Sequence, residues 1–242
     1  MSDLEVLVSH RDRVVVRVRD TFVKLDHRPG RPGPEVAALA AAPVPTPAVL
    51  WHHDGALALA RVPGAPLDDA SPSAAWAAAG ATARRIHDAP PPAGAEIVFG
   101  GDAALGWIED DRVFLDEREL IEPDLFDAHL AIARRHLGGR DVPPVFLHGD
   151  YQPVHVFVDG EEVVGVIDWA DACLGDPMFD LAVLTGTHQH RLDDVLRGYG
   201  DRDADPDAIR GWWSLRRLGE LRWMVEHGYP IDDRLRALRD TL

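Results

Sequence analysis

The chain has 242 residues and 46% hydrophobic content, which is enough to bury a sizeable core in one large domain or two small lobes. Its formal net charge of −16 disfavours nucleic acid and anionic membrane surfaces as partners and favours cationic small molecules, although an acidic surface also serves solubility alone. The single cysteine, Cys173, rules out an intrachain disulfide and suits a reducing compartment, so we expect a cytoplasmic protein.

No membrane contact is expected from the hydropathy pattern. The first five residues include two acids, where a signal peptide has basic residues and then an apolar run. The longest apolar candidate, residues 36–51, is broken by Pro43, Pro45 and Pro47. No segment reaches the roughly 18 uninterrupted apolar residues of a membrane span.

The first sixty residues have the alternation and the β-branched bias of strands. Pro34 can begin a short helix that runs to Ala42. Pro63-Gly64-Ala65-Pro66 is the clearest linker signal, and it predicts a boundary between residues 1–62 and residues 63–242. We expect strands over residues 4–8, 14–19, 21–25, 49–51 and 56–61.

Beyond the linker, most patterns are helical. Ser71 and Pro72 can cap and begin an alanine-rich helix that runs to His87. Further helices are expected through residues 126–137, after Asp176-Pro177, after Asp205-Pro206 and over residues 231–242. A short strand over residues 145–147 and a hairpin of residues 154–158 and 163–167 complete an α+β fold with a small β-rich lobe and a larger helical lobe.

Two carboxylates carry the strongest chemical signal. Asp150 and Asp168 each follow an apolar, strand-like run, and a short hairpin lies between them. Asp150 can accept the hydrogen bond and later the proton of a substrate hydroxyl, and Asp168 is a hard oxygen ligand that suits Mg²⁺ on a triphosphate. Either residue alone is commonly a turn or cap residue. The pair across one hairpin favours phosphoryl transfer.

Three motifs at these positions closely resemble the aminoglycoside phosphotransferase family, a kinase-like group that includes macrolide phosphotransferases and small-metabolite kinases. They are His148-Gly149-Asp150, Ile167-Asp168-Trp169, and Gly175-Asp176-Pro177 with Asp180-Leu181-Ala182. The resemblance covers nearly the whole chain and is stronger in its C-terminal part. It implies a bilobal protein-kinase-like fold, ATP as donor and a magnesium ion. It also implies Asp150 as the catalytic aspartate, Asp168 as a metal ligand and Asp176 as a support of these loops from behind.

The resemblance assigns nucleotide binding to residues 1–62 and catalysis and acceptor binding to residues 63–242. Lys24, at the end of a predicted strand, matches the family's phosphate-contacting lysine, and Glu35 is the candidate ion-pair partner. Without the resemblance, Lys24 is an ordinary solvated charge at a strand edge. Backbone groups from Ala60 to Val62 match the hinge that binds adenine.

One departure from the family pattern lies in the turn between the first two predicted strands. This turn, residues 9–13, holds no glycine that would let the backbone approach phosphates closely. Arg11 or Arg13 can supply side-chain charge in place of backbone donors, and exposed turn arginines are the plainer interpretation.

The second departure is His155, which stands where most of the family has asparagine as the other metal ligand. Proteins that resemble macrolide phosphotransferases share this histidine. Three interpretations stay open: His155 ligates the metal and shifts its preference from Mg²⁺ toward Mn²⁺, it contacts phosphate or substrate, or the site is catalytically weak.

These patterns predict an ATP-dependent phosphotransferase that acts on a hydroxyl of a small, cationic, sugar-bearing molecule such as an aminoglycoside or macrolide antibiotic. A small-metabolite kinase of the same fold is the first alternative. A nucleotide-binding pseudokinase without turnover is the second, and the missing glycines and His155 motivate it. The acceptor pocket is built from scattered helix positions, so the motifs describe the phosphate chemistry better than the acceptor.

Overall fold

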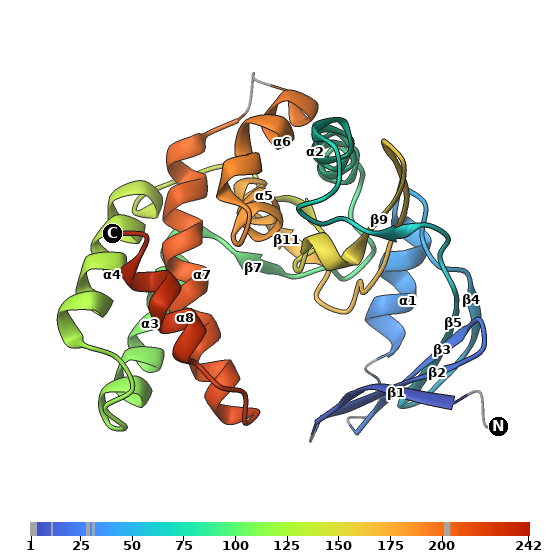
Figure 1. Cartoon of the computed structure of the whole chain (residues 1–242), viewed down its shortest axis with the longest axis horizontal. Coiled ribbons are helices and arrows are strands. Elements are labelled where there is room, and N and C mark those ends of the chain that lie inside the picture. Colours follow the sequence, from blue (N-terminus) through green and yellow to red (C-terminus); the bar gives the residue numbers. More distant parts are fainter. Residues whose placement is uncertain (1–3, 11, 28–29, 31, 201–203) are drawn as a thin grey trace.

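The computed structural model describes residues 4–10, 12–27, 30, 32–200 and 204–242. Figure 1 shows a small lobe of strands β1 to β5 with helix α1, and a larger lobe that is mostly helical. This is the α+β arrangement that the sequence predicts. Among the described residues, none of the helices combines the length and the apolar character that a bilayer crossing requires.

The β-rich lobe is built on one antiparallel sheet in the order β1-β2-β3-β5-β4. All five predicted strands are present. The central strand β5 buries Leu57, Ala58 and Leu59, whereas every residue of the edge strand β1 is exposed. Helix α1 (Pro32–Ala41) carries the buried Glu35 on the cleft side of this lobe. The strands are β1 (Leu4–Ser9), β2 (Arg13–Val18), β3 (Thr21–Asp26), β4 (Val49–His53) and β5 (Ala56–Ala60).

Two small three-stranded sheets follow in the helical lobe, in the orders β10-β9-β6 and β7-β11-β8. The predicted linker forms β6, which pairs with β9. The chain therefore joins a sheet of the second lobe at Ala65. The division into residues 1–62 and 63–242 stays a prediction. The strands are β6 (Ala65–Pro66), β7 (Ile97–Phe99), β8 (Val145–Leu147), β9 (Val156–Asp159), β10 (Glu162–Val166) and β11 (Cys173–Gly175).

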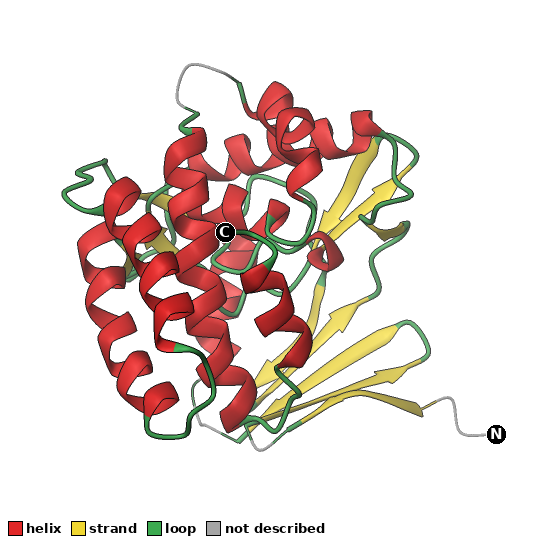
Figure 2. Ribbon diagram, turned by 60° about the vertical axis from the view of Figure 1, so that its left-hand side comes forward, coloured by secondary structure: helices red, strands yellow, loops and turns green. Residues whose placement is uncertain are grey.

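Helix α7 lies at the centre of the helical lobe (Figure 1), where it contacts α3, α4, α5 and α8. Figure 2 shows the helices gathered on one side of the molecule and most of the strands on the other. Asp205 caps α7 as predicted, because its carboxylate accepts the N–H groups of Asp207 and Ala208 at 3.1 Å. The helices of this lobe are α2 (Ser73–His87), α3 (Gly101–Asp116), α4 (Pro123–Leu137), α5 (Met178–Thr185), α6 (Leu192–Tyr199), α7 (Pro206–Glu226) and α8 (Asp232–Arg239), with short 3₁₀ turns at Pro153–His155 and Gln189–Arg191.

Aromatic side chains fill the core of the helical lobe. Trp76, Trp169, Trp212 and Phe126 are all at most 1% exposed, and burial of each contributes roughly 2–3 kcal/mol relative to exposure. The predicted Ser71 cap of α2 is wrong. The Ser71 hydroxyl bonds to the Asp68 carboxylate at 3.0 Å instead, and Pro72 occupies the N-cap position.

Candidate active site

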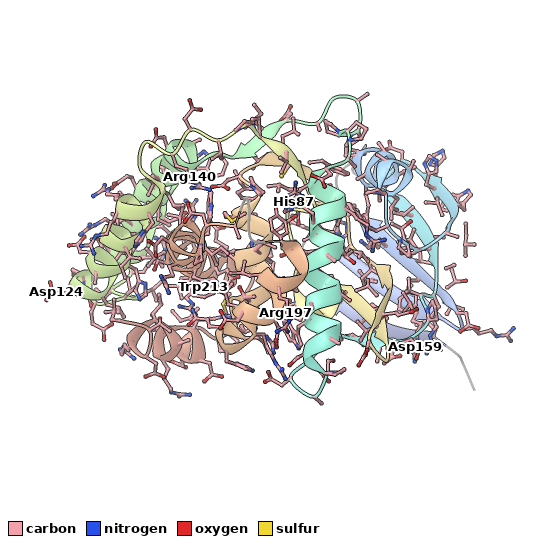
Figure 3. All side chains as sticks on the ribbon, turned by 90° about the horizontal axis from the view of Figure 1, so that it is seen from above. His87, Asp124, Arg140, Asp159, Arg197 and Trp213 are labelled. Carbon is pink, nitrogen blue, oxygen red and sulfur yellow. The ribbon has the colours of Figure 1, made fainter. Side chains whose placement is uncertain are left out.

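The predicted catalytic loop leaves strand β8 at His148 and is held from behind by one buried carboxylate. Asp180, on α5, accepts the backbone N–H of His148 at 2.8 Å and that of Gly149 at 3.0 Å. Its Oδ2 also lies 3.2 Å from Nε2 of His87, which Figure 3 labels at one end of α2. With both oxygens bonded, Asp180 fixes the direction in which the next residue, Asp150, leaves the strand.

Gly149 allows the loop to turn at this point. Its φ of +82° is in the left-handed region, and a Cβ atom there would lie 1.9 Å from the carbonyl oxygen of Asp171. Only glycine fits such an approach of two backbones.

The support role predicted for Asp176 therefore belongs to Asp180. Asp176 instead accepts Arg140 Nε at 2.7 Å, Trp212 Nε1 at 3.1 Å and the backbone N–H of Met178 at 3.0 Å. These contacts fix the start of α5 against α7. Asp176 thus acts on the catalytic loop only through α5, the helix that carries Asp180.

Asp150 points into the cleft and contacts a residue that the sequence patterns did not indicate. Its Oδ1 accepts Arg216 Nη2 at 2.8 Å and Gln152 Nε2 at 2.9 Å. Arg216 is held in turn by Glu220, one turn further along α7, at 3.0 Å. The Arg216–Glu220 spacing is an ordinary helix-surface pair, so no signal in the sequence marks it as part of a site.

Asp168 follows β10 in a backbone conformation that is rare for a residue with a side chain, with φ at +61°. Its Oδ1 lies 2.7 Å from Lys24 Nζ and 3.7 Å from Arg13 Nη1. Burial by itself would raise the pKa of Asp168. The nearby charges of Lys24 and Arg13 outweigh burial and hold its pKa well below the usual range, so Asp168 is a carboxylate at neutral pH.

Lys24 and Glu35 form the predicted ion pair. Lys24 Nζ lies 2.5 Å from Glu35 Oε1, and both residues are buried. Burial opposes the charge on Lys24, but Asp168 and Glu35 together raise its pKa. The ammonium group of Lys24, on β3, thus contacts two further predicted residues, Glu35 on α1 and Asp168 just after β10.

His155 lies between the two aspartates. Its Nε2 is 3.9 Å from Asp168 Oδ2, and its Nδ1 is 3.5 Å from Asp150 Oδ2 and 2.8 Å from the Asp150 carbonyl oxygen. A carbonyl oxygen only accepts, so Nδ1 carries a proton. In the neutral ring the unprotonated Nε2 then faces Asp168, which is the orientation of a metal-ligating histidine.

The buried His148 ties the two aspartate segments together. Its Nδ1 accepts the backbone N–H of Asp150 at 3.2 Å, and its Nε2 lies 2.9 Å from the carbonyl oxygen of Ile167. Nε2 therefore carries the proton of a neutral ring. Burial lowers the pKa of His148, which keeps it in this form.

Two backbone N–H groups of the predicted adenine hinge are already hydrogen-bonded within the protein. The N–H of Ala60 bonds to the Ala48 carbonyl at 2.9 Å, and the N–H of Arg61 bonds to the Asp20 carbonyl at 2.8 Å. These two donors are therefore engaged. The carbonyl of Ala60 and the backbone of Val62 remain as candidate adenine contacts.

Arg13 is the described member of the two arginines proposed for the phosphates, whereas Arg11 lies outside the described residues. Its Nε donates to Asp26 Oδ1 at 3.0 Å, which fixes the guanidinium beside Asp168. Its Nη2 atom is buried and has no hydrogen-bond partner among the described residues. A buried donor in this state is a candidate contact for an anionic ligand.

A cleft with a cavity volume of about 1250 Å³ opens next to Asp150. Acidic residues outnumber basic ones along its described wall: Glu96, Asp111, Asp150, Asp171 and Glu220 face Arg216 and Arg234. Trp107, Trp223 and Tyr229 add large aromatic surfaces that are 42–50% exposed. The cleft therefore favours a cationic ligand with ring surfaces.

Comparison with known proteins finds a matching family and related sequences. The model of the phosphotransferase enzyme family matches residues 3–212. The viomycin phosphotransferase of Streptomyces vinaceus is 30% identical over 190 residues, which cover 66% of this chain and 62% of that protein. The chain thus aligns with about three fifths of this curated relative.

Solved structures share the fold at lower identity. The macrolide 2'-phosphotransferase MphH of Brachybacterium faecium superposes with a TM-score of 0.71 at 22% identity, covering 97% of this chain and 91% of that one. The GDP and kanamycin complex of APH(2")-IIia gives a TM-score of 0.75 at 16% identity, covering 98% and 92%.

Proposed function

Because the chain belongs to the phosphotransferase enzyme family, we propose that it transfers the γ-phosphoryl group of ATP to a hydroxyl of a small cationic molecule. One observation carries this proposal: Asp150 and Asp168, from separate segments, flank the single imidazole ring of His155. Phosphoryl transfer needs an aligned hydroxyl and a metal-bound phosphate next to each other, and these two carboxylates offer both functions at that spacing.

Asp150 orients the acceptor hydroxyl and accepts its proton. Oδ1 accepts both Arg216 and Gln152, whereas Oδ2 accepts Gln152 alone, at 3.0 Å, and lies 3.5 Å from His155 Nδ1. A hydroxyl placed against this oxygen is aligned for attack on a phosphorus atom near Asp168. Alignment of this kind supplies most of the catalysis in phosphoryl transfer, because the transition state needs little covalent help from the protein.

Asp168 and His155 fit a divalent cation on the phosphates. Asp168 supplies an ionised oxygen, and the lone pair of His155 Nε2 faces the same space. Such an ion neutralises phosphate charge and orients the γ-phosphoryl group when bound. The nitrogen ligand favours Mn²⁺ relative to an all-oxygen site, while Mg²⁺ remains the physiological candidate. This arrangement supports ligation by His155 over a direct phosphate contact, because a phosphate needs a donor at Nε2.

Lys24 steadies the donor phosphates from the β-rich lobe, held in place by Glu35. Adenine lies against the Ala60 carbonyl and the Val62 backbone, where the two lobes join. A nucleoside triphosphate placed between this hinge and Asp168 directs its γ-phosphoryl group toward Asp150.

The acceptor is an antibiotic with amino and sugar or peptide groups. The acidic wall of the cleft attracts ammonium groups, and its exposed aromatic rings suit the apolar faces of sugar or peptide rings. The similarity to a viomycin phosphotransferase supports this acceptor class. A small-metabolite kinase is the alternative within the same chemistry.

The test measures ATP consumption with Mg²⁺ or Mn²⁺ in the presence of viomycin, kanamycin, a macrolide or small amino alcohols. We expect turnover with at least one cationic antibiotic. Asp150→Asn is expected to lower kcat by about 10³-fold or more while ATP binding persists. Nucleotide binding without turnover for any acceptor or metal would support the pseudokinase instead.

A second variant isolates the role of His155. His155→Asn is expected to increase the ratio of activity with Mg²⁺ to activity with Mn²⁺, because an amide oxygen replaces a nitrogen ligand. An unchanged metal preference, together with a higher KM for ATP, would assign His155 to the phosphates instead.

A further inference from the structure

A cluster of three polar side chains, which includes neither Asp150 nor Asp168, joins the two lobes. His10 and Asp12 belong to the turn between β1 and β2, and His227 follows the last residue of α7. Their candidate ligand atoms all lie within 4.8 Å of one another. In Figure 1 this turn and the end of α7 approach each other across the opening between the lobes.

The tautomer of His227 is fixed by the backbone. Its Nδ1 lies 2.7 Å from the carbonyl oxygen of Trp223, so Nδ1 carries a proton. The stacked ring of Trp223, with centroids 4.4 Å apart, holds the imidazole in this orientation. Nε2 therefore faces Asp12 Oδ2 at 3.3 Å, and in the neutral ring it presents a lone pair to a carboxylate.

Two acceptors at this distance require a cation between them. A proton on Nε2 satisfies the contact, and so does a metal ion. Ligand atoms bound to a tetrahedral Zn²⁺ at its usual bond lengths are about 3.3–3.4 Å apart. The Asp12–His227 separation of 3.3 Å matches this spacing, and it also lies at the long end of N–H···O hydrogen bonds.

We propose that His10, Asp12 and His227 bind a divalent transition-metal ion of the Zn²⁺ class, which bridges the β1–β2 turn to the end of α7. Two imidazoles and one carboxylate are a common ligand set for this class, with water in the fourth position. The His227 bond to a backbone carbonyl is the outer-shell contact that such ligands usually make. The site is distinct from the nucleotide metal site, because its ligands are neither Asp168 nor His155.

His10 is the third ligand, and its ligation breaks an existing hydrogen bond. Its ring meets that of His227 edge to face with centroids 5.2 Å apart, and its Nδ1 accepts the Asp12 N–H at 3.2 Å. Ligation through Nδ1 replaces this long bond, and ligation through Nε2 moves the ring proton to Nδ1 and breaks it. His10 therefore contributes less affinity than His227 or Asp12.

The experiment uses the whole chain, stripped of metal with a chelator and dialysed against Zn²⁺ in excess Mg²⁺. We expect one tightly bound Zn²⁺ per chain by elemental analysis. His227→Ala and Asp12→Ala are each expected to weaken Zn²⁺ binding at least tenfold, and His10→Ala by less. His190→Ala, at a 61% exposed histidine beside Asp69, is the matched control and should bind Zn²⁺ like the parent.

Asp168→Asn separates this proposal from the proposed function. It is expected to abolish phosphoryl transfer while Zn²⁺ binding persists. Zn²⁺ is also expected to reduce the radius of gyration in solution scattering by joining the lobes, and this change should be lost in His227→Ala. The proposal is overturned if no Zn²⁺ binds, if His227→Ala binds it equally, or if the bound ion is lost only in Asp168→Asn. Absent Zn²⁺ binding would assign the contact to an imidazolium–carboxylate pair.

Discussion

Arg216 determines how Asp150 is presented to an acceptor. The guanidinium bonds to Asp150 Oδ1 and to Glu220, so together with Gln152, which bonds to both carboxylate oxygens, it sets the rotation of the carboxylate. Arg216→Ala is expected to lower kcat by about 10–100-fold, because a loosened carboxylate aligns the hydroxyl less often. KM for ATP should change little.

Steady-state kinetics with the best antibiotic acceptor would measure this split between kcat and KM. Arg210→Ala is the matched control, since Arg210 lies on the same helix and pairs with the exposed Asp207 at the surface. The positioning role is refuted by equal kinetics in the two variants.

Arg13 offers the charge that the glycine-free turn lacks. Its buried Nη2 has no partner among the described residues, and its neighbour Asp168 is the proposed metal ligand. We expect Arg13→Gln to raise KM for ATP by about 10–100-fold, the equivalent of one lost charge-assisted hydrogen bond. Arg17→Gln, four residues along the same strand and paired with the exposed Glu5, should leave KM for ATP unchanged. If Arg13→Gln keeps the parent's KM for ATP, Arg13 does not contact the nucleotide.

The sequence motifs predicted which residues meet, but not all that holds them. Asp150, Asp168, Lys24 and Glu35 converge as expected, since each stands at a strand end or helix start that the fold brings to one cleft. Arg216 was not predicted, because its partner lies 66 residues away and its local spacing is that of an ordinary helix residue. Asp180 belongs to one of the quoted motifs, but its hydrogen bonds to His148 and Gly149, across 32 and 31 residues, exist only in the folded chain. The His155 tautomer likewise depends on a carbonyl that only the folded backbone places.

At the scale of elements, the turn at Gly149 links β8 to Asp150, the proposed catalytic residue. Gly149→Ala is expected to destabilise the protein by at least about 2–3 kcal/mol and to abolish activity, because its Cβ would collide with the Asp171 carbonyl. Gly160→Ala is the control, with a φ of +62° and no atom within 4 Å of the position that its Cβ would take. It should cost only about 1 kcal/mol, from backbone strain alone. Denaturant unfolding would distinguish the two, and similar losses would contradict the collision.

Helices α4, α7 and α8 are joined through His129, which is fully buried. Its Nδ1 lies 3.1 Å from the Ser214 hydroxyl and its Nε2 lies 2.9 Å from the Leu238 carbonyl. Burial lowers the pKa of His129 below its ordinary value. The unfolded chain takes up a proton below about pH 6.5 while the folded chain does not, so stability is present above that pH and is lost as pH falls.

His129→Gln is therefore expected to unfold more easily at pH 7.5 and to lose less stability than the parent between pH 7 and pH 5. The glutamine amide does not titrate between pH 5 and pH 7, so the free energy of unfolding depends less on pH. The free energy of unfolding in urea at several pH values measures it. His190→Gln, at an exposed histidine, should keep the parent's slope. If the free energy of unfolding of His129→Gln changes with pH as steeply as that of the parent, other groups control acid unfolding.

Some elements were not predictable for physical reasons. Helix α3 buries only Gly101, Ala104, Ile108 and Leu115, so its apolar stripe is too thin to stand out from its acidic residues. Strands β6, β7 and β11 contain two or three residues each, which is shorter than any alternation can reveal. The long helix α7 and the sheet of the β-rich lobe were predictable because capping residues and β-branched alternation mark them.

At the scale of the whole molecule, the net charge of −16 and the acidic cleft act together on an incoming acceptor. Raising the ionic strength from about 20 mM to about 200 mM shortens the screening length from roughly 20 Å to roughly 7 Å. We therefore expect kcat/KM for a polycationic acceptor such as kanamycin to fall severalfold or more, with kcat at saturation nearly constant.

The acceptor's own charge provides the control for this effect. An uncharged alcohol that is also phosphorylated should show little salt dependence, because steering acts only on charge. Glu220→Gln removes one carboxylate of the cleft wall and should lower the salt sensitivity for kanamycin, whereas Asp124→Asn, on helix α4 away from the described cleft wall, should not. Equal salt dependence for charged and uncharged acceptors would mean that salt acts on ATP or on the fold, and the cationic-acceptor assignment would fail.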